Sequence, residues 1–194
     1  MIFFHIFVPT TSHNAMKYLS FFILLFIGEL SVSAQHMFSR QFPFFNQLSS
    51  NEIFSIHQDR EGYFWIGTTN GLARYDGYQL NTFRTDYKNQ NLLTDNGITA
   101  INDNDLYVWI GTWKGLNLYN KQTCRITPFS DARLLDKVVD AITVDKDGNV
   151  WVSAGGMIYR CDSTAHIIKE YEVGNIQEGY AISNIYVDQQ KQRS

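Results

Sequence analysis

The stretch Trp65–Asp76 reads "WIGTTNGLARYD", and the chain repeats its pattern twice. The second copy is "WIGTWKGLNLYN" (109–120) and the third is "WVSAGGMIYRCD" (151–162). In each copy Trp is followed by an aliphatic residue, a small residue, a Gly-containing turn and a segment that ends at Asp or Asn. A period of about 41 to 45 residues is typical of proteins built from repeated structural units.

The segments upstream of each Trp are also similar. They read "IFSIHQDREGYF" (53–64), "ITAINDNDLYV" (98–108) and "VDAITVDKDGNV" (139–150). An Asp lies six residues before each Trp, at positions Asp59, Asp103 and Asp145. We interpret this series as turn residues, because Asp side chains accept hydrogen bonds from nearby backbone N–H groups. Two copies place Gly in the same turn, whereas the middle copy has Leu106, so its turn is expected to differ.

Short β-rich segments separated by Gly and Asp argue against helices. A four-stranded unit repeated at this length is typical of the blades of a β-propeller. The Trp segments are apolar at almost every position, which is expected where neighbouring blades cover both faces of a sheet. We therefore predict an all-β fold, a β-propeller of four-stranded antiparallel blades, with Trp65, Trp109 and Trp151 in the core between blades.

The repeats predict blades at about 49–84, 94–130 and 137–172, and the start of a fourth blade at 180–194. A propeller needs about four to eight blades to close into a ring. The sequence therefore predicts an incomplete propeller, three blades plus the start of a fourth, as an N-terminal fragment of a longer protein. "FPFF" (42–45) is expected to supply the outer strand that would complete the last blade.

Residues 1–34 have the features of a signal peptide. Lys17 precedes an apolar run from Tyr18 to Leu30, and "SVSA" (31–34) is an acceptable cleavage site after Ala34. Met16 is the alternative start, and an uncleaved membrane anchor is the alternative to cleavage. We expect residues 35–194 to be an exported, partial propeller domain.

The composition excludes several classes of function. Charged residues are 18% of the chain and the net charge is −3, without the basic stripe that nucleic-acid binding requires. The two cysteines, Cys124 and Cys161, cannot form a disulfide framework, and two free thiols are expected, with a single bridge between them as the alternative. "DKDGN" (145–149) lacks the Gly position and the closing Glu of a calcium loop, so we predict no metal site and no cofactor.

The repeat resembles the two-component regulator propeller repeat, whose pattern is I-x-x-D, a turn Gly, and W-[IV]-G-T-x-x-G-L-x-x-Y-D. "DREGYFWIGTTNGLARYDG" (59–77) matches this pattern almost letter for letter. The second copy lacks the turn Gly, and the third has Cys161 in place of Tyr. The resemblance covers Phe42 to Asp188.

The resemblance implies a function in signal transduction. Such repeats form the periplasmic sensor region of hybrid two-component histidine kinase and response regulator proteins, which recognise oligosaccharides and control glycan-use genes. It also implies that the parent protein is anchored in the inner membrane, supplies the remaining blades and domains, and forms a homodimer. This chain itself contains no kinase residues. The alternatives are a protein-interaction scaffold and a truncated remnant without function. A glycosidase or lyase is disfavoured, because glycoside hydrolysis generally needs two carboxylates set across the substrate.

Loops at one end of the blades carry polar and aromatic residues suited to sugar hydroxyls and ring faces. The candidate ligand-binding residues are Asn51, Asn70, Asn96, Trp113, Lys114 and Tyr180. For each one, an ordinary solvated turn is the alternative. Trp113 is the most distinctive, because the blade core does not require an indole in this turn. It either covers a neighbouring loop or provides a stacking platform for a sugar, with Lys114 as a donor or as a charge for an acidic glycan.

Overall fold

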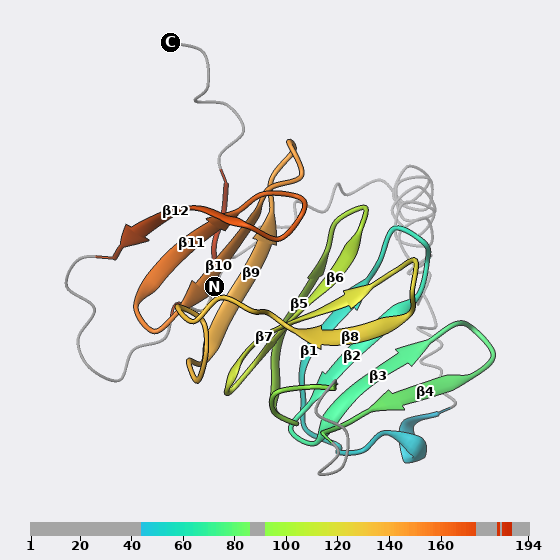
Figure 1. Cartoon of the computed structure of the whole chain (residues 1–194). Coiled ribbons are helices and arrows are strands. Elements are labelled where there is room, and N and C mark those ends of the chain that lie inside the picture. Colours follow the sequence, from blue (N-terminus) through green and yellow to red (C-terminus); the bar gives the residue numbers. More distant parts are fainter. Residues whose placement is uncertain (1–43, 86–91, 174–181, 183, 188–194) are drawn as a thin grey trace, which may run out of the picture. The chain divides into compact units, whose positions relative to one another are not determined.

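The computed structural model describes residues 44–85, 92–173, 182 and 184–187, and every structural statement below concerns these residues. Their strands form three four-stranded antiparallel sheets, each made of four consecutive strands (Figure 1). We call these sheets blades 1, 2 and 3. The predicted all-β fold with four-stranded antiparallel blades is therefore confirmed, and the three blades do not close into a ring. The predicted signal peptide lies outside the described residues, as does most of the predicted fourth blade.

The strands are short and joined by tight hairpins within each blade. Blade 1 contains β1 (Ile53–Gln58), β2 (Phe64–Thr68), β3 (Gly71–Tyr75) and β4 (Leu80–Phe83). Blade 2 contains β5 (Ile98–Asp103), β6 (Tyr107–Thr112), β7 (Gly115–Asn120) and β8 (Arg125–Pro128). Blade 3 contains β9 (Val139–Val144), β10 (Val150–Ala154), β11 (Met157–Cys161) and β12 (Ile167–Glu172).

Consecutive blades pack face to face. We define the forward face of a blade as the one that packs on the following blade, and the rear face as the opposite one. The forward face carries the repeated Trp, an aliphatic residue on the third strand and an aromatic residue on or just after the fourth. These residues are Trp65, Leu72 and Phe83 in blade 1, Trp109, Leu116 and Phe129 in blade 2, and Trp151, Ile158 and Tyr171 in blade 3. The ring centroids of the Trp and the second aromatic residue lie 6.2, 6.1 and 5.6 Å apart.

The rear face supplies aliphatic residues from the first two strands. In blade 2, Ile101, Val108 and Ile110 belong to the same buried cluster as Trp65 and Leu72. In blade 3, the residues that pack in one cluster with Trp109 and Leu116 are Ile142, Val150 and Val152. Trp65 and Trp109 are fully buried, whereas Trp151 is only partly buried, because no complete blade packs on it within the described residues.

The Gly after each Trp-Ile pair allows two blades to approach closely. A Cβ atom on Gly67 would lie 2.6 Å from Ile98 Cγ2, and one on Gly111 would lie 2.7 Å from Val139 Cγ1. Both distances are too short for carbon atoms, so any larger residue would separate the blades. Blade 3 has Ser153 at this position, fully buried and without a hydrogen-bond partner for its hydroxyl in the described structure.

Two of the repeated Asp residues form the predicted turns. Asp59 accepts hydrogen bonds from the backbone N–H groups of Glu61 and Tyr63, and from Trp65 Nε1 at 2.7 Å. Asp145 does the same in blade 3, with Trp151 Nε1 at 3.1 Å. One carboxylate thus fixes both the hairpin and the orientation of the indole.

The prediction of the same role for Asp103 is wrong. In blade 2 the turn acceptor is Asn104, whose Oδ1 accepts hydrogen bonds from the N–H groups of Leu106 and Tyr107 at 3.0 and 2.9 Å. This turn lacks the Gly that adopts a positive φ in the other two, and it is one residue shorter. Asp103 therefore becomes the last residue of β5. The Nε1 of the buried Trp109 is left without a partner among the described residues.

Asp103 instead joins blades 1 and 2. Its buried carboxylate lies 2.7 Å from His57 Nε2 and 2.7 Å from Lys121 Nζ, and it accepts the N–H of Arg60 at 3.3 Å. Burial alone would raise the pKa of Asp103, but the hydrogen bonds from His57, Lys121 and Arg60 lower it to about 2. His57 and Arg60 belong to blade 1, so this carboxylate is a polar link across the interface between the two blades.

Two smaller expectations have different outcomes. The described part of "FPFF" does not form a strand: Phe44 lies in a turn and Phe45 begins the 3-10 helix η1 (Phe45–Gln47). The ring of Phe44 lies 5.3 Å from that of Tyr75, so this stretch packs on blade 1. Both cysteines are free, with Cys124 exposed and Cys161 buried. Burial raises the pKa of the Cys161 thiol to about 12.

Replacing Trp109 by Ala is expected to lower the free energy of unfolding by about 3–5 kcal/mol, since it leaves a large cavity between two blades. Trp151→Ala is the matched control, because its ring is only partly buried, and it should cost less than half as much. Denaturant unfolding followed by far-UV circular dichroism measures both. Equal losses would contradict the assignment of Trp109 to the inter-blade core.

The two buried indoles should respond differently to replacement by Phe. Trp65→Phe removes the Nε1 donor to Asp59 and leaves a buried carboxylate oxygen without its partner, whereas Trp109→Phe removes an unpaired donor. We expect Trp65→Phe to be more destabilising than Trp109→Phe by about 1–3 kcal/mol. Denaturant unfolding followed by far-UV circular dichroism measures the stability of both variants. A greater loss of stability in Trp109→Phe than in Trp65→Phe would refute the shifted turn of blade 2.

Asp103→Asn should destabilise the chain by about 3–5 kcal/mol at pH 7, because Lys121 then stays buried without a carboxylate. Since the folded pKa of Asp103 is depressed to about 2, its stabilising effect is complete above pH 4 and is lost as the pH falls towards 2. The stability difference between wild type and variant should therefore shrink by on the order of 2 kcal/mol between pH 6 and pH 2. The control is Asp105→Asn, which removes an exposed ion pair with Arg60 and should cost under about 1 kcal/mol at both pH values.

Candidate functional site

The candidate site lies where β2 turns into β3 and β6 turns into β7. The Thr that ends each W-I-G-T motif builds the turn: Thr68 Oγ1 donates to the carbonyl of Gly71 at 2.8 Å and accepts the N–H of Asn70 at 3.1 Å. Thr112 makes the same two bonds to Gly115 and Lys114 in blade 2. The motif thus fixes which residues project from the end of each blade, namely 69–70 and 113–114.

Asn70 and Asn96 hold these loops together. Asn70 Nδ2 donates to the carbonyl of Ser49 at 3.1 Å, and its Oδ1 accepts a hydrogen bond from Arg84. Asn96 Oδ1 accepts the N–H of Thr85 at 2.8 Å, and the Asn96 carbonyl accepts the N–H of Gly71 at 2.7 Å. The two predicted residues are therefore brought to the same loop cluster, where their amides position the backbone.

The other predicted polar residues differ in their surroundings. Asn51 is exposed in the bend that precedes β1. Lys114 is exposed, and its Nζ lies 3.9 Å from Asp95 Oδ2, so its charge is partly offset. Asp95 also accepts the N–H of Gly97 at 2.8 Å. Tyr180 lies outside the described residues.

Trp113 covers a neighbouring loop, which is the first of the two roles considered for it. Its backbone N–H donates to the carbonyl of Gly97 at 3.1 Å, and its indole lies on Gly97, where any added Cβ would overlap the ring. The ring of Phe54 lies 6.3 Å away in an edge-on arrangement. Even so, 44% of the Trp113 surface is exposed. The indole thus packs on a neighbouring loop and still presents a large apolar surface to solvent.

Phe54 reaches Trp113 because of a bulge in β1. The register of β1 and β2 skips Phe54, and the registers of blades 2 and 3 skip Thr99 and Asp140 in the same way. Bulges redirect side chains and occur often beside functional sites. Phe54 is 56% exposed. The Thr99 hydroxyl donates to the Val139 carbonyl at 2.5 Å, and burial raises the pKa of Asp140.

The sequence prediction missed Phe54 and Gly97. A signal for Phe54 exists, because the other two copies have polar residues at this position, but it is visible only when the strands are aligned by register. Gly97 precedes β5 in an ordinary "DNG" turn, and its role depends on the indole that lies on it. Phe54, Gly97 and Trp113 together form an exposed aromatic platform.

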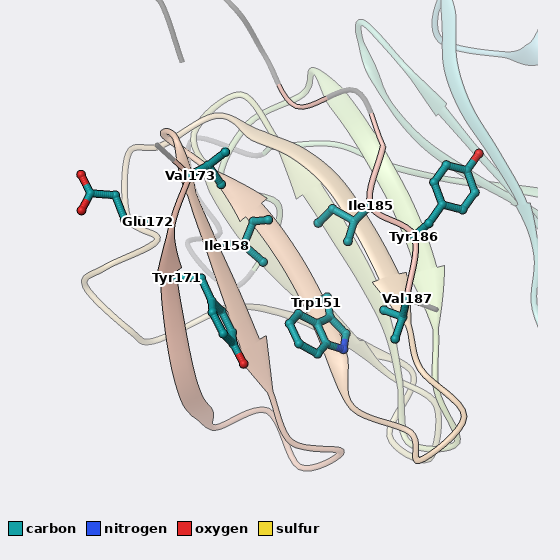
Figure 2. Close-up of a pocket in the computed structure, with 8 residues that line it drawn as sticks. All are labelled: Trp151, Ile158, Tyr171, Glu172, Val173, Ile185, Tyr186 and Val187. Carbon is teal, nitrogen blue, oxygen red and sulfur yellow. The ribbon is translucent and has the colours of Figure 1, made fainter. Parts of the chain in front are cut away.

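A separate cavity lies on the forward face of blade 3. It is open to solvent and has a volume of about 550 Å³. Figure 2 shows Trp151, Ile158 and Tyr171 on neighbouring strands, with Ile185 and Val187 on the segment across from them. In blades 1 and 2 the equivalent face is covered by the following blade. We therefore interpret this cavity as part of an inter-blade surface, separate from the aromatic platform.

Two absences complete the description of residues 44–85, 92–173, 182 and 184–187. No cluster of His, Cys, Asp and Glu side chains suited to a metal ion is present among them. They also contain no helix of the length and hydropathy needed to span a membrane.

The chain resembles several solved extracellular domains. The extracellular domain of the hybrid two component system BT3049 from B. thetaiotaomicron has 26% sequence identity and a TM-score of 0.58, over 69% of this chain and 20% of that chain. The extracellular domain of BT4673, from the same organism, has 21% identity and a TM-score of 0.57 over 73% and 20% of the two chains. This chain therefore spans about a fifth of the length of these structures.

A more distant likeness shows the fold alone. Virginiamycin B lyase from Staphylococcus aureus has 18% identity and a TM-score of 0.51, over 64% of this chain and 42% of that chain. No curated protein sequence matches the chain significantly.

The family comparison agrees with the repeat pattern. Residues 47–70, which include β1 and β2, match the family model described as "Two component regulator propeller". Asp59, Gly67 and Thr68 of this segment are the residues that orient the indole, admit the next blade and build the turn. The predicted repeat is thus confirmed at the first blade: residues 47–70 match the two component regulator propeller repeat.

Proposed function

We propose that the chain contributes its three blades to the periplasmic, ligand-sensing propeller of a hybrid two-component sensor. The ligand is an oligosaccharide, and its binding controls the transcription of glycan-use genes. The likeness to an extracellular two component domain at 26% identity supports the sensing role. In this proposal the chain is exported by cleavage after Ala34, and the parent protein is anchored in the inner membrane.

The observation that carries the oligosaccharide proposal is the exposed aromatic platform. An indole in water forgoes about 25 cal/mol for each Å² of apolar surface that a ligand could cover. A sugar ring has an apolar face that fits an aromatic surface, and its hydroxyls need polar partners at the edge. Trp113 offers the surface, and the exposed amine of Lys114 lies on the same turn.

The platform is held in place before any ligand arrives. Gly97 lies under the indole and Phe54 meets its edge, so the ring has few alternative positions. Asp95 links the two parts of the site, because it accepts the Gly97 N–H and lies beside Lys114. Pre-organisation of this kind lowers the entropic cost of binding. The sequence variation between blades in these loops suits recognition, since the blade core does not constrain it.

Trp113→Ala is expected to weaken oligosaccharide binding by at least tenfold, because the stacking surface is removed while the blade core is untouched. The oligosaccharide is first chosen as the best ligand of the chain on a glycan array, and is then titrated by calorimetry. Tyr78→Ala is the matched control: Tyr78 is 86% exposed in the turn between β3 and β4, and its loss should leave affinity unchanged.

Unfolding measurements on the same variants separate binding from packing. If Trp113→Ala keeps full affinity while the thermal stability falls, the indole serves only to cover the loop and the ligand site lies elsewhere. Gly97→Ala is a second test, because a methyl group at this position would displace the Trp113 ring without removing it. It should also weaken binding.

A further inference from the structure

The first strands of the three blades have a bulge at the same place. The residue that the ladder skips is Phe54 in β1, Thr99 in β5 and Asp140 in β9. In each blade the skip lies opposite two residues at the end of the second strand, 67–68, 111–112 and 153–154. Because β5 lies beside both β1 and β9, the three skipped residues follow one another from blade to blade. We call them the bulge row.

The bulges turn these side chains out of the packed interface between blades. In β5 and β9 the residues immediately before and after the bulge are buried, whereas Thr99 and Asp140 themselves are only partly buried. Phe54 is exposed. The bulge row therefore remains accessible where the strand residues around it are committed to the core.

The bulge row continues the aromatic platform. Phe54 belongs to both, because its ring meets the edge of the Trp113 indole. The Thr99 hydroxyl donates to the carbonyl of Val139, the residue directly before Asp140. An aromatic surface on blades 1 and 2 thus leads to a hydroxyl group on blade 2 and a carboxyl group on blade 3.

Asp140 differs from the acidic residues that build the blades. Asp59, Asp103 and Asp145 each accept several hydrogen bonds. Burial raises the pKa of Asp140, and no charge or hydrogen bond from the described residues lowers it again. Asp140 also cannot repeat the bond of Thr99, because a carboxylate has no proton to donate to a carbonyl. A partly desolvated carboxylate with free acceptor positions is unfavourable for folding and typical of a binding site.

We infer that the bulge row determines the specificity of the oligosaccharide site, where Asp140 accepts hydrogen bonds from the hydroxyl groups of a neutral sugar and excludes sugars that carry a carboxylate or sulfate. This inference rests on the proposed oligosaccharide-sensing function. The two oxygens of a carboxylate can accept hydrogen bonds from two neighbouring hydroxyls of one ring. An anionic sugar would instead meet a like charge in a partly desolvated site, where repulsion is stronger than in water.

The positive charges at this end of the blades do not reverse that preference. Lys114 Nζ lies 3.9 Å from Asp95 Oδ2, so its charge is partly offset. Lys137 Nζ is held by the Tyr159 hydroxyl at 3.0 Å. Asp140 therefore keeps its negative charge without a counter-ion among the described residues.

The first test is the stability of Asp140→Asn in the full chain at pH 7. This variant should have a melting temperature at least equal to that of wild type, because an amide of the same shape carries no charge to desolvate. Asp147→Asn is the matched control: it makes the same change of charge at an exposed residue in the turn between β9 and β10 of the same blade. A lower melting temperature for Asp140→Asn alone would show that the carboxylate serves the fold, and would overturn the inference.

The second test is binding of the full chain to a glycan array that pairs neutral hexasaccharides with acidic counterparts. One such pair is a mannose hexasaccharide and the mannuronic acid hexasaccharide of the same linkage, which differ only in the carboxylates. Wild type should prefer the neutral members, and the neutral hexasaccharide with the strongest signal is then titrated by calorimetry. Asp140→Asn should weaken its binding at least tenfold and reduce the preference for it over its acidic counterpart. Phe54→Ala should weaken binding as well, and Asp147→Asn should leave it unchanged.

The possible failures separate this inference from the sensing function. If Trp113→Ala weakens binding of the neutral hexasaccharide and Asp140→Asn does not, the platform binds the sugar and the bulge row plays no part. If wild type prefers the acidic members of the array, the exclusion assigned to Asp140 is wrong although the chain still binds glycans. If wild type binds no member of the array, the oligosaccharide proposal and this inference fail together.

Discussion

The structure depends on the packing of each repeated Trp against the first strand of the next blade. A four-stranded sheet has two apolar faces and cannot bury either one alone, so stability arises between blades. The Trp supplies the surface, the Gly two residues later removes the Cβ that would hold the sheets apart, and an Asp or Asn at the preceding turn fixes the hairpin. These constraints act together at two blade interfaces and explain why the motif is repeated so closely in sequence.

The middle blade shows how far the pattern can change without loss of the fold. A turn shorter by one residue transfers the acceptor role to Asn104 and frees the carboxylate of Asp103, which then links two blades through His57 and Arg60. The cost is an indole N–H without a partner in Trp109. Asp103 forms a buried ion pair with Lys121 of its own blade, and its contacts with His57 and the Arg60 N–H join blade 2 to blade 1.

The sequence was sufficient for the blades, since the spacing of Trp, Gly and Asp reports local strand and turn geometry directly. The role of Asp103 could not be predicted from the sequence, because counting residues back from Trp109 assumes that the turns of all three blades have equal length. Among the candidate site residues, Trp113 could be identified from its unusual turn position, and Asn70 and Asn96 from their loops. Phe54 and Gly97 could not, because their roles depend on which loop of one blade lies over which strand of another.

The bulges at Phe54, Thr99 and Asp140 leave one residue on the first strand of each blade outside the strand ladder. A residue that the ladder skips contributes little to strand pairing, so its identity can change while the sheet stays intact. In this chain the three positions already hold an aromatic ring, a hydroxyl and a carboxyl group. A repeat of this design can therefore place a different side chain on the first strand of each blade by a single mutation, without a change in the strand ladder.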